Sequence, residues 1–278
     1  MTNTTLINTT PIIIPPIEER LYFNAADSLL YCRKCGAPKQ TRKIFRGQSE
    51  LFYIHCDCER KAIEAYEQDL KRRETEHRLS TLRSGGFHDA VSRLCTFERD
   101  KVHSAKLMYC KSYTEKWSET GAHGAGLLLW GPNGTGKTFA ALCIANALID
   151  EGISVRVTSF PEILSRITGI DFNEQENYLR TFTGCSLLIL DDFGKERNTD
   201  YAYEKMFYVI DTRYRLKKPT IVTTNLILKA LEHPTDERTA ALYQRILERN
   251  TPVFFDGPNI RSIITQETRQ AQRQLLKV

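Results

Sequence analysis

From residue 90 onward, short apolar runs alternate with longer amphipathic stretches. The apolar runs have the length and composition of strands and cover 127–130, 155–159, 187–190, 220–223 and 253–255. Helix-like stretches lie between them, among them 138–149, 201–214 and 238–249. Nearly continuous apolar strands that alternate with helices are typical of a parallel sheet covered on both faces. The pattern therefore predicts an α/β domain with a mostly parallel sheet flanked by helices over residues 90–278.

The pattern before residue 90 is different. Residues 1–28 are rich in Thr, Asn and Pro and show little periodicity, so we expect a flexible tail. Two strand-like runs, 40–45 and 50–55, are joined by Arg46-Gly47-Gln48, which predicts a hairpin. Residues 29–60 are therefore expected to form a small hairpin domain.

A charged helix is predicted to follow the hairpin. Residues 59–83 contain no Pro or Gly, and their acids and bases alternate around a thin apolar stripe of Ile63, Tyr66 and Leu70. Ser84-Gly85-Gly86 ends the pattern, so residues 61–89 are expected to be a helical linker with a hinge at the glycines. The basic run at 71–73 could touch DNA, but a solvated helix face is the favoured interpretation.

Composition and charge exclude little. A chain of 278 residues that is 41% hydrophobic and 26% charged can bury a real core, and a net charge of +5 permits nucleic-acid contact without demanding it. No apolar run reaches the roughly 18 residues that a membrane span needs. The N-terminus lacks the charged segment of a signal peptide, so we expect a cytoplasmic protein without a membrane partner.

A phosphate-binding loop follows the first apolar run of the sheet. The eight residues Gly131, Pro132, Asn133, Gly134, Thr135, Gly136, Lys137 and Thr138 fit the pattern G-x-x-x-x-G-K-[ST] in full. Glycines let backbone N–H groups close around phosphate oxygens, and the helix that follows directs its positive end at them. Lys137 is expected to reach the β- and γ-phosphates of ATP, and the Thr138 hydroxyl to ligate Mg²⁺.

Carboxylates and an amide follow two later strands. Asp191 and Asp192 end the run 187–190, at the strand edge where such sheets bind ligands. We expect Asp191 to hold Mg²⁺ and Asp192 to orient the attacking water. Asn225 follows the next strand and is a candidate to position that water near the γ-phosphate.

Four of the eight cysteines form a cluster. Cys32 and Cys35, then Cys56 and Cys58, give C-x₂-C…C-x-C with twenty residues between the pairs, flanking the predicted hairpin. Four thiolates on two knuckles can hold a tetrahedral Zn²⁺, and four protein ligands make such a site structural. One spacer residue in the second pair departs from the usual two, so His55 and His77 are possible substitutes. Buried thiols or a redox pair are the alternatives.

These motifs together resemble a known family. The segments GLLLWGPNGTGKTFAALCIANAL, LLILDDFG, PTIVTTNL and YQRILERN are similar, in this order, to bacterial replicative helicase loaders of the DnaC/DnaI type. Those loaders are AAA+ ATPases related to the IstB-type transposition ATPases. The resemblance covers residues 90 to about 263 and implies ATP hydrolysis and self-association in the presence of ATP. It also implies delivery of a hexameric replicative helicase to single-stranded DNA.

The resemblance also implies roles for single residues. Asn225 resembles the sensor 1 residue, and Arg249 resembles the arginine finger that reaches a neighbouring subunit's ATP. Arg261 stands where a sensor 2 arginine would, although too few residues follow it for a full helical lid. In initiator-type relatives the segment that corresponds to 161–182 lines a DNA path, and Arg166, Arg180 and Phe182 could serve there. An ordinary surface helix is an equally open interpretation of that segment.

Two other functions remain open at this point. One is a transposition helper ATPase of the IstB type, which would bind duplex DNA and a transposase. The other is an ATP-binding scaffold that never hydrolyses its nucleotide and recruits a partner through the cysteine hairpin. Loaders of the DnaI type carry an N-terminal zinc domain that docks on the helicase, so the cysteine cluster favours the loader.

Overall fold

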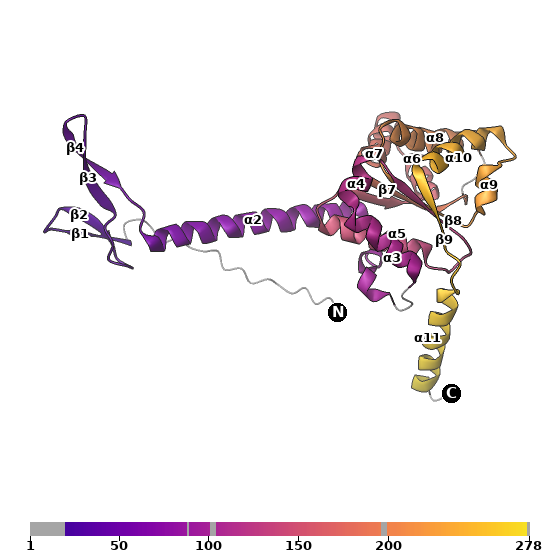
Figure 1. The fold of residues 1–278 in the computed structure, drawn as a ribbon, viewed down its shortest axis with the longest axis horizontal. Coiled ribbons are helices and arrows are strands. Elements are labelled where there is room, and N and C mark those ends of the chain that lie inside the picture. The colour runs from indigo at the N-terminus through magenta and orange to yellow at the C-terminus, as the bar shows by residue number, and fades with distance from the viewer. Residues whose placement is uncertain (1–19, 88, 101–103, 196–198, 277–278) are drawn as a thin grey trace. The chain divides into compact units, whose positions relative to one another are not determined.

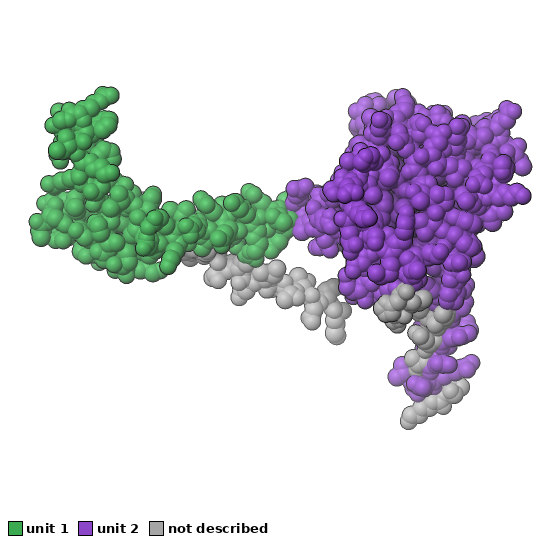
Figure 2. All heavy atoms as spheres, viewed as in Figure 1, with its two compact units in different colours: residues 1–77 green, residues 78–278 purple. Residues whose placement is uncertain are grey.

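The computed structural model describes residues 20–87, 89–100, 104–195 and 199–276. The chain divides into two compact units, Met1–His77 and Arg78–Val278 (Figure 2). The first holds the cysteine cluster, and the second holds the phosphate-binding loop.

The first unit contains two antiparallel hairpins and the start of a long helix (Figure 1). Strands β1 (Leu21–Asn24) and β2 (Leu29–Cys32) pair, as do β3 (Gln40–Phe45) and β4 (Gln48–Tyr53). The first pair corrects our expectation of a tail over 1–28, because residues 21–24 form a strand on β2; residues 1–19 lie outside the described residues. The predicted hairpin is present, with Arg46 and Gly47 at positive φ in its turn (50° and 82°), as a tight two-residue turn requires.

Helix α2 (Asp57–Gly86) runs through the glycines that we expected to form a hinge. Gly86 is buried: a β-carbon there would lie 2.8 Å from Ile149 Cδ1 and 3.1 Å from the Val155 carbonyl oxygen. The glycine therefore allows the helix end to pack closely on the second unit's core, which is a different role from that of a hinge. Arg83 and Asp150, 2.7 Å apart, add a surface ion pair beside it.

The second unit is an α/β fold around one five-stranded parallel sheet, as the apolar pattern predicted. Its strands are β5 (Gly126–Trp130), β6 (Val155–Thr158), β7 (Leu187–Phe193), β8 (Thr220–Thr224) and β9 (Asn250–Phe254). They lie in the order β6-β7-β8-β5-β9, so β8 separates the strand that ends at the phosphate-binding loop from the strand that ends at the aspartates. This order brings the loop, the aspartates and Asn225 to one edge of the sheet.

Helices connect these strands. The larger ones are α3 (Ala105–Glu115), α4 (Trp117–Ala122), α5 (Lys137–Asp150), α6 (Phe160–Ile167), α7 (Phe172–Gly184), α8 (Asp200–Arg215), α10 (Glu237–Arg249) and α11 (Ile260–Leu276). Short turns complete the set: the 3₁₀ helices Ser92–Leu94 and Phe97–Arg99, and α9 (Leu228–Glu232). Among the described residues, no helix is both long enough and apolar enough to cross a membrane.

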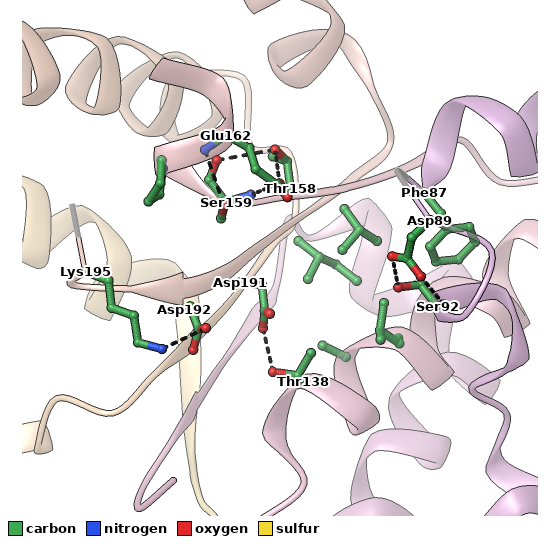
Figure 3. A pocket seen from close by; sticks show the side chains of 15 residues that line it. Phe87, Asp89, Ser92, Thr138, Thr158, Ser159, Glu162, Asp191, Asp192 and Lys195 are labelled. Carbon is green, nitrogen blue, oxygen red and sulfur yellow. Dashed lines mark hydrogen bonds and ion pairs between the residues drawn. The ribbon is translucent and has the colours of Figure 1, made fainter. Parts of the chain in front are cut away.

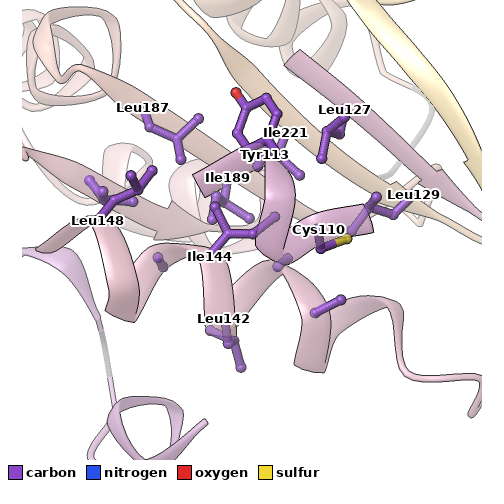
Figure 4. Packing of buried hydrophobic residues seen from close by; sticks show 14 of the residues in the cluster. Cys110, Tyr113, Leu127, Leu129, Leu142, Ile144, Leu148, Leu187, Ile189 and Ile221 are labelled. Carbon is purple, nitrogen blue, oxygen red and sulfur yellow. The ribbon is translucent and has the colours of Figure 1, made fainter. Parts of the chain in front are cut away.

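The apolar core has two layers because successive strand residues face opposite sides of the sheet. Leu127 and Leu129 pack with α3 and α5 on one side (Figure 4). Leu128 packs with α6, α7, α8 and α10 on the other. Burial on both faces explains why these strands read as continuous apolar runs in the sequence.

A buried arginine joins three chain segments at the end of the sheet where β7 and β8 begin. Arg213 on α8 is 1% exposed, and burial lowers its pKa. Its guanidinium donates to the carbonyl oxygens of Phe182, Cys185, Ser186 and Pro219 and to the Thr220 hydroxyl. Five acceptors satisfy the five N–H groups of the guanidinium without a carboxylate, so Arg213 fixes where β7 and β8 begin.

Candidate functional site

The phosphate-binding loop lies between β5 and α5. Gly131, Gly134 and Gly136 have φ of 137°, 81° and 98°, values that other residues rarely adopt. A β-carbon on Gly131 would collide with the Phe255 carbonyl oxygen, and one on Gly134 with the Asn259 side chain. The glycines are therefore required by both backbone conformation and close packing, and the loop conformation leaves the N-terminus of α5 accessible to an anion.

Lys137 points back into this loop. Its Nζ donates to the carbonyl oxygens of Gly131 at 2.8 Å and Pro132 at 2.7 Å, while the Thr135 hydroxyl donates to Pro132 at 2.9 Å. The lysine is 6% exposed, and burial lowers its pKa, although the nearby carboxylates of Asp192 and Asp191 act in the opposite direction. A largely buried cation with carbonyl partners alone is well suited to attract a phosphate.

Two hydroxyl groups hold Asp191 at the end of β7. Asp191 Oδ1 accepts from Thr138 at 2.9 Å and from Thr223 at 2.5 Å. Burial raises the pKa of Asp191, and these two hydrogen bonds partly reverse that effect. Thr138 and Asp191, which are 53 residues apart in the sequence, thus form one oxygen cluster of the kind that Mg²⁺ prefers. The structure fits the expected pair of Mg²⁺ ligands, whose role remains a proposal.

Asp192 lies in a bulge of β7. Leu190 pairs with Val222 and Phe193 with Thr224, so Asp191 and Asp192 together stand opposite one residue of β8. Asp192 has a φ of 56°, its N–H donates to the Thr223 hydroxyl at 2.9 Å, and its carboxylate pairs with Lys195 at 2.8 Å. The bulge gives the two carboxylates different partners: Asp191 is partly buried against Thr138, and Asp192 is half exposed beside Lys195.

A cavity of about 290 Å³ adjoins these carboxylates (Figure 3). Thr138, Asp191, Asp192 and Lys195 line one part of it, and Glu162 lies across from them. Glu162 accepts from the Ser159 backbone N–H and the Thr158 hydroxyl, so it caps α6. The cavity gives water access to the aspartates from the side of β6.

Asn225 comes directly after β8, whose residue Thr224 pairs with Trp130 just before the loop. Its Oδ1 is buried and has no hydrogen-bond partner in the part of the chain that the structure describes. Such an orphaned acceptor is costly unless a donor satisfies it. A water molecule next to the γ-phosphate of bound ATP would supply that donor, so the position of the Asn225 side chain fits an ATP site.

Sequence reasoning did not identify two contributors to this edge. Thr223 bridges Asp191 and the Asp192 N–H, and Lys195 pairs with Asp192. The hydroxyl at a buried strand end was a signal for Thr223, since a buried polar side chain needs a partner. Lys195 carried no such signal, because a lysine three residues after an aspartate is common on surfaces.

Arg249 ends α10 at the end of the sheet where the parallel strands begin, whereas the phosphate-binding loop lies at the end where they finish. The next residue, Asn250, pairs with Gly126, whereas the loop begins after Trp130, about 13 Å further along β5. The Arg249 guanidinium lies 5.2 Å from the Tyr214 ring centre, and Tyr214 donates to Glu248 at 2.6 Å. Its neighbour Arg245 is occupied by an ion pair with Asp211 at 2.6 Å.

Arg261 lies in the first turn of α11, near the phosphate-binding loop. The Ile260 N–H donates to the Gly134 carbonyl oxygen at 2.8 Å, which ties α11 to the loop. The charge of Arg261 helps to lower the pKa of Lys137, and its side chain is exposed. These positions suit a second cation near a phosphate, and that role also remains a proposal.

In the segment expected to line a DNA path, Phe172 at the start of α7 is 74% exposed, whereas Phe182 is not available to a ligand. Phe182 is 2% exposed and packs edge-on against Tyr178 in the core, so it cannot stack on a base. Arg180 pairs with Glu176 at 2.7 Å, and Arg166 is exposed. The expectation for Phe182 is therefore wrong, because the apolar face of α7 is needed to cover the sheet.

The four clustered cysteines converge in the first unit. Their sulfurs all lie within 4.8 Å of one another, with Cys58 Sγ 3.1 Å from Cys56, 3.4 Å from Cys32 and 3.5 Å from Cys35. A tetrahedron of Zn–S bonds has edges of about 3.8 Å, so the arrangement fits Zn²⁺. His55 binds Glu59 at 2.8 Å, and His77 lies about 28 Å further along α2, so neither belongs to the group.

The surroundings of the sulfurs favour the thiolate of Cys32 and disfavour that of Cys58. The Cys35 backbone N–H is the main cause of the lowered pKa of Cys32, about 6, whereas hydrogen bonding with Cys56 raises that of Cys58 to about 12. Thiols this close cannot all ionise unless a cation compensates their charge. Lys39 is buried beside this group: its Nζ forms an ion pair with Glu59, lies over the Tyr53 ring and is 3.9 Å from Cys56 Sγ. The sequence did not identify this lysine as part of the site.

Known proteins share the second unit. The family model described as IstB-like ATP binding protein matches residues 105–267. The replicative helicase loader DnaI of Bacillus subtilis is 26% identical over 215 residues, which cover 72% of this chain and 69% of the relative. The replicative helicase loader DnaC of Escherichia coli K12 is 28% identical over 182 residues, covering 62% and 71%.

A solved structure has the same fold. The crystal structure of DnaI superposes with a TM-score of 0.53 at 21% identity and covers 63% of this chain and 94% of that one. At this identity the likeness extends to the fold of the ATP-binding unit.

Proposed function

We propose, from the premise that this chain belongs to the family of IstB-like ATP-binding proteins, that it is an ATP-driven loader of a replicative helicase. ATP hydrolysis to ADP and phosphate would be its only chemistry and would time the release of the helicase onto single-stranded DNA. The observation that carries the proposal is the joint presence of the Thr138–Asp191 contact and a four-cysteine unit in one chain. Relatives named helicase loaders support it.

Each residue of the ATP site has a proposed role. The N–H groups of residues 131–136 and the Lys137 ammonium hold the phosphates, with Arg261 as a further cation. Thr138 and Asp191 would hold Mg²⁺, which neutralises phosphate charge when bound. Asp192 accepts a hydrogen bond from the attacking water and orients it, and Asn225 fixes that water from the side of β8.

Asp192→Asn is expected to keep ATP binding and to lower turnover by about 10²–10⁴-fold, because the amide cannot act as the base that orients water. Asparagine tolerates the positive φ of this position, so the bulge should remain. Steady-state phosphate release measures turnover, and a nucleotide titration measures binding. Asp150→Asn, on the surface at the other end of α5, is the matched control and should behave as wild type. Wild-type turnover in the Asp192 variant would assign the role elsewhere.

Arg249 is proposed to act on the ATP of a neighbouring subunit. It lies at the edge of the sheet away from its own phosphate-binding loop, so an action within the same subunit is not supported by its position. Its guanidinium lies over the Tyr214 ring, and Tyr214 is itself held by its hydrogen bond to Glu248. Such a finger stabilises charge on the transferring phosphoryl group and would be contributed only where subunits meet.

Arg249→Ala is expected to lower ATPase activity by about 10³-fold or more in the assembled state. Mixing this variant with the Asp192→Asn variant should restore part of the activity, because an intact Asp192 site can then face an intact Arg249. Arg238→Ala, at the other end of α10, is the control and should retain activity. At high dilution, where the subunits separate, Arg249→Ala should have little effect on ATPase activity. A loss there as large as in the assembled state would contradict action between subunits.

The cysteine unit is proposed to dock on the helicase. The resemblance to loaders of the DnaI type, which carry an N-terminal zinc domain, favours this over an IstB-type transposition helper. The family model nevertheless keeps that alternative open, because it is named after the IstB-like proteins. A helper would bind duplex DNA and a transposase.

Capture from a host lysate on the immobilised chain, with and without ATP, tests the proposal. The replicative helicase should be enriched in the captured material when identified by mass spectrometry. Enrichment of a transposase, with salt-dependent duplex binding and no helicase, would select the transposition helper. Absence of ATP turnover in the wild-type protein would instead select a non-hydrolysing scaffold.

A further inference from the structure

One short segment of the first unit carries basic residues without any acid. Between Asp27 and Glu50 the chain has six lysines and arginines and no acid: Arg33, Lys34, Lys39, Arg42, Lys43 and Arg46. The whole chain has a net charge of only +5, so this segment is far more basic than the rest. It comprises the first cysteine knuckle and the outer part of the β3–β4 hairpin.

Most of these charges are not neutralised within the protein. Lys39 is buried on Glu59, whereas Arg42, Lys43 and Arg46 are exposed and take part in no ion pair among the described residues. Glu50 stands opposite Lys43 in the hairpin register, and the two form no ion pair. The exposed side chains of the hairpin are therefore free to meet a polyanion.

Aromatic side chains share the hairpin with these cations. The register places Lys43, Phe45 and Phe52 on one face, with Lys43 and its cross-strand neighbour Glu50 between the two rings along the hairpin axis. Phe45 and Phe52 are 52% and 38% exposed. The Arg46 guanidinium lies 5.5 Å from the Phe45 ring centre, so a cation already flanks one stacking platform. We call this face, made of Lys43, Phe45 and Phe52 with Arg46 at the turn, the aromatic face.

Other candidate DNA contacts of the chain lack this combination. The basic run at 71–73 is partly neutralised within α2, because both Arg72 and Arg73 pair with Asp69. In α7 the aromatic Phe182 is in the core, and the exposed Phe172 has no unpaired cation on its helix because Arg180 pairs with Glu176. Exposed rings interleaved with unpaired cations are the features that bind single strands by stacking and by phosphate contacts.

We propose that the aromatic face of the β3–β4 hairpin is a binding site for single-stranded DNA. Unpaired bases stack on Phe45 and Phe52, while Lys43 and Arg46 contact the phosphates on either side. Arg42 lies on the opposite face and adds only to the general positive charge of the hairpin. Base pairs of a duplex cannot offer their faces to these rings, so the site discriminates single strands from duplexes. This site goes beyond the ATP-driven activity proposed above and needs no nucleotide.

Fluorescence anisotropy of a labelled oligothymidylate of about 20 nucleotides tests the proposal on the full chain without ATP. The variant Arg42→Gln, Lys43→Gln, Arg46→Gln should bind about 100-fold more weakly at 0.1 M salt, and the slope of log K against log salt should fall by about 2. Phe45→Ala and Phe52→Ala should each weaken binding roughly tenfold. Zinc content and circular dichroism verify folding, which these exposed positions should not disturb.

The matched control is Lys71→Gln, Arg72→Gln, Arg73→Gln, which removes three charges from the same unit. It should keep nearly wild-type affinity for the oligonucleotide and a nearly unchanged salt slope. Equal losses in the two triple variants, or none in the hairpin variant, would overturn the site. Equal losses on a duplex of the same length would overturn the single-strand assignment. Loss of helicase capture with unchanged oligonucleotide affinity would make the hairpin a protein-docking surface instead.

Discussion

Lys137→Ala is expected to abolish measurable ATP binding. The side chain is 6% exposed and is the buried cation of the loop, held by the carbonyl oxygens of Gly131 and Pro132. Its removal deprives the β- and γ-phosphates of a charge-assisted partner, a loss of about 2–5 kcal/mol or more. Titration with a fluorescent ATP analogue measures the effect.

Two further measurements separate this effect from misfolding. Lys229→Ala removes an exposed charge from α9 and should bind ATP as wild type does. Thermal unfolding of Lys137→Ala should remain cooperative, because the two core layers on the sheet do not depend on this side chain. Near-normal ATP affinity in a folded Lys137→Ala variant would refute the assignment of the phosphate-binding loop.

Removal of the metal is expected to unfold the first unit. Of the described residues 20–77, only Cys32, Lys39 and Cys56 are buried, so no aliphatic or aromatic side chain forms a core there. So small a segment cannot compensate its conformational entropy by apolar burial. Metal binding must then supply most of its folding free energy, roughly 10 kcal/mol or more for structural zinc.

Chelation, or Cys32→Ser with Cys35→Ser, should therefore unfold the two hairpins and abolish partner binding. ATP binding should remain, because the second unit has its own sheet and core. Elemental analysis should find about one zinc per chain in wild type and in the control Cys95→Ser, whose thiol lies outside the group. Metal-free protein with hairpin amides fully protected in hydrogen exchange would refute the zinc site.

Local patterns predicted much of the second unit and its motifs. The apolar runs located β5 to β8, because strands buried on both faces must be apolar at nearly every position. The run 253–255 found only the end of the edge strand β9, whose Thr251 and Pro252 are exposed. Strand ends were less well predicted: β7 continues through Asp191 and Asp192 to Phe193, where polar residues interrupt the apolar signal. Residues 21–24 were missed as a strand because a half-exposed two-stranded hairpin has almost no periodic burial to reveal it.

The glycines at 85–86 show how one signal has two physical meanings. Gly ends many helices, and from sequence alone the pair indicated a hinge. In the fold α2 continues to Gly86, where the absence of a β-carbon lets the helix approach Ile149 and the β6 backbone. Only the position of α5 and β6 in space decides between the two.

The sequence by itself determined the chemistry that this chain can hold. The phosphate-binding loop and the four cysteines are recognisable because a loop that encloses phosphate and a knuckle that binds metal need particular residues at short, fixed spacings. The tertiary structure alone decided which distant residues share a site. The strand order inserts β8 between β5 and β7, and so sets Thr223 against Asp191. It also leaves the Asn225 oxygen without a hydrogen-bond partner among the described residues. Phe182 became core and the hairpin rings stayed exposed for the same reason, since burial depends on which faces the folded chain covers.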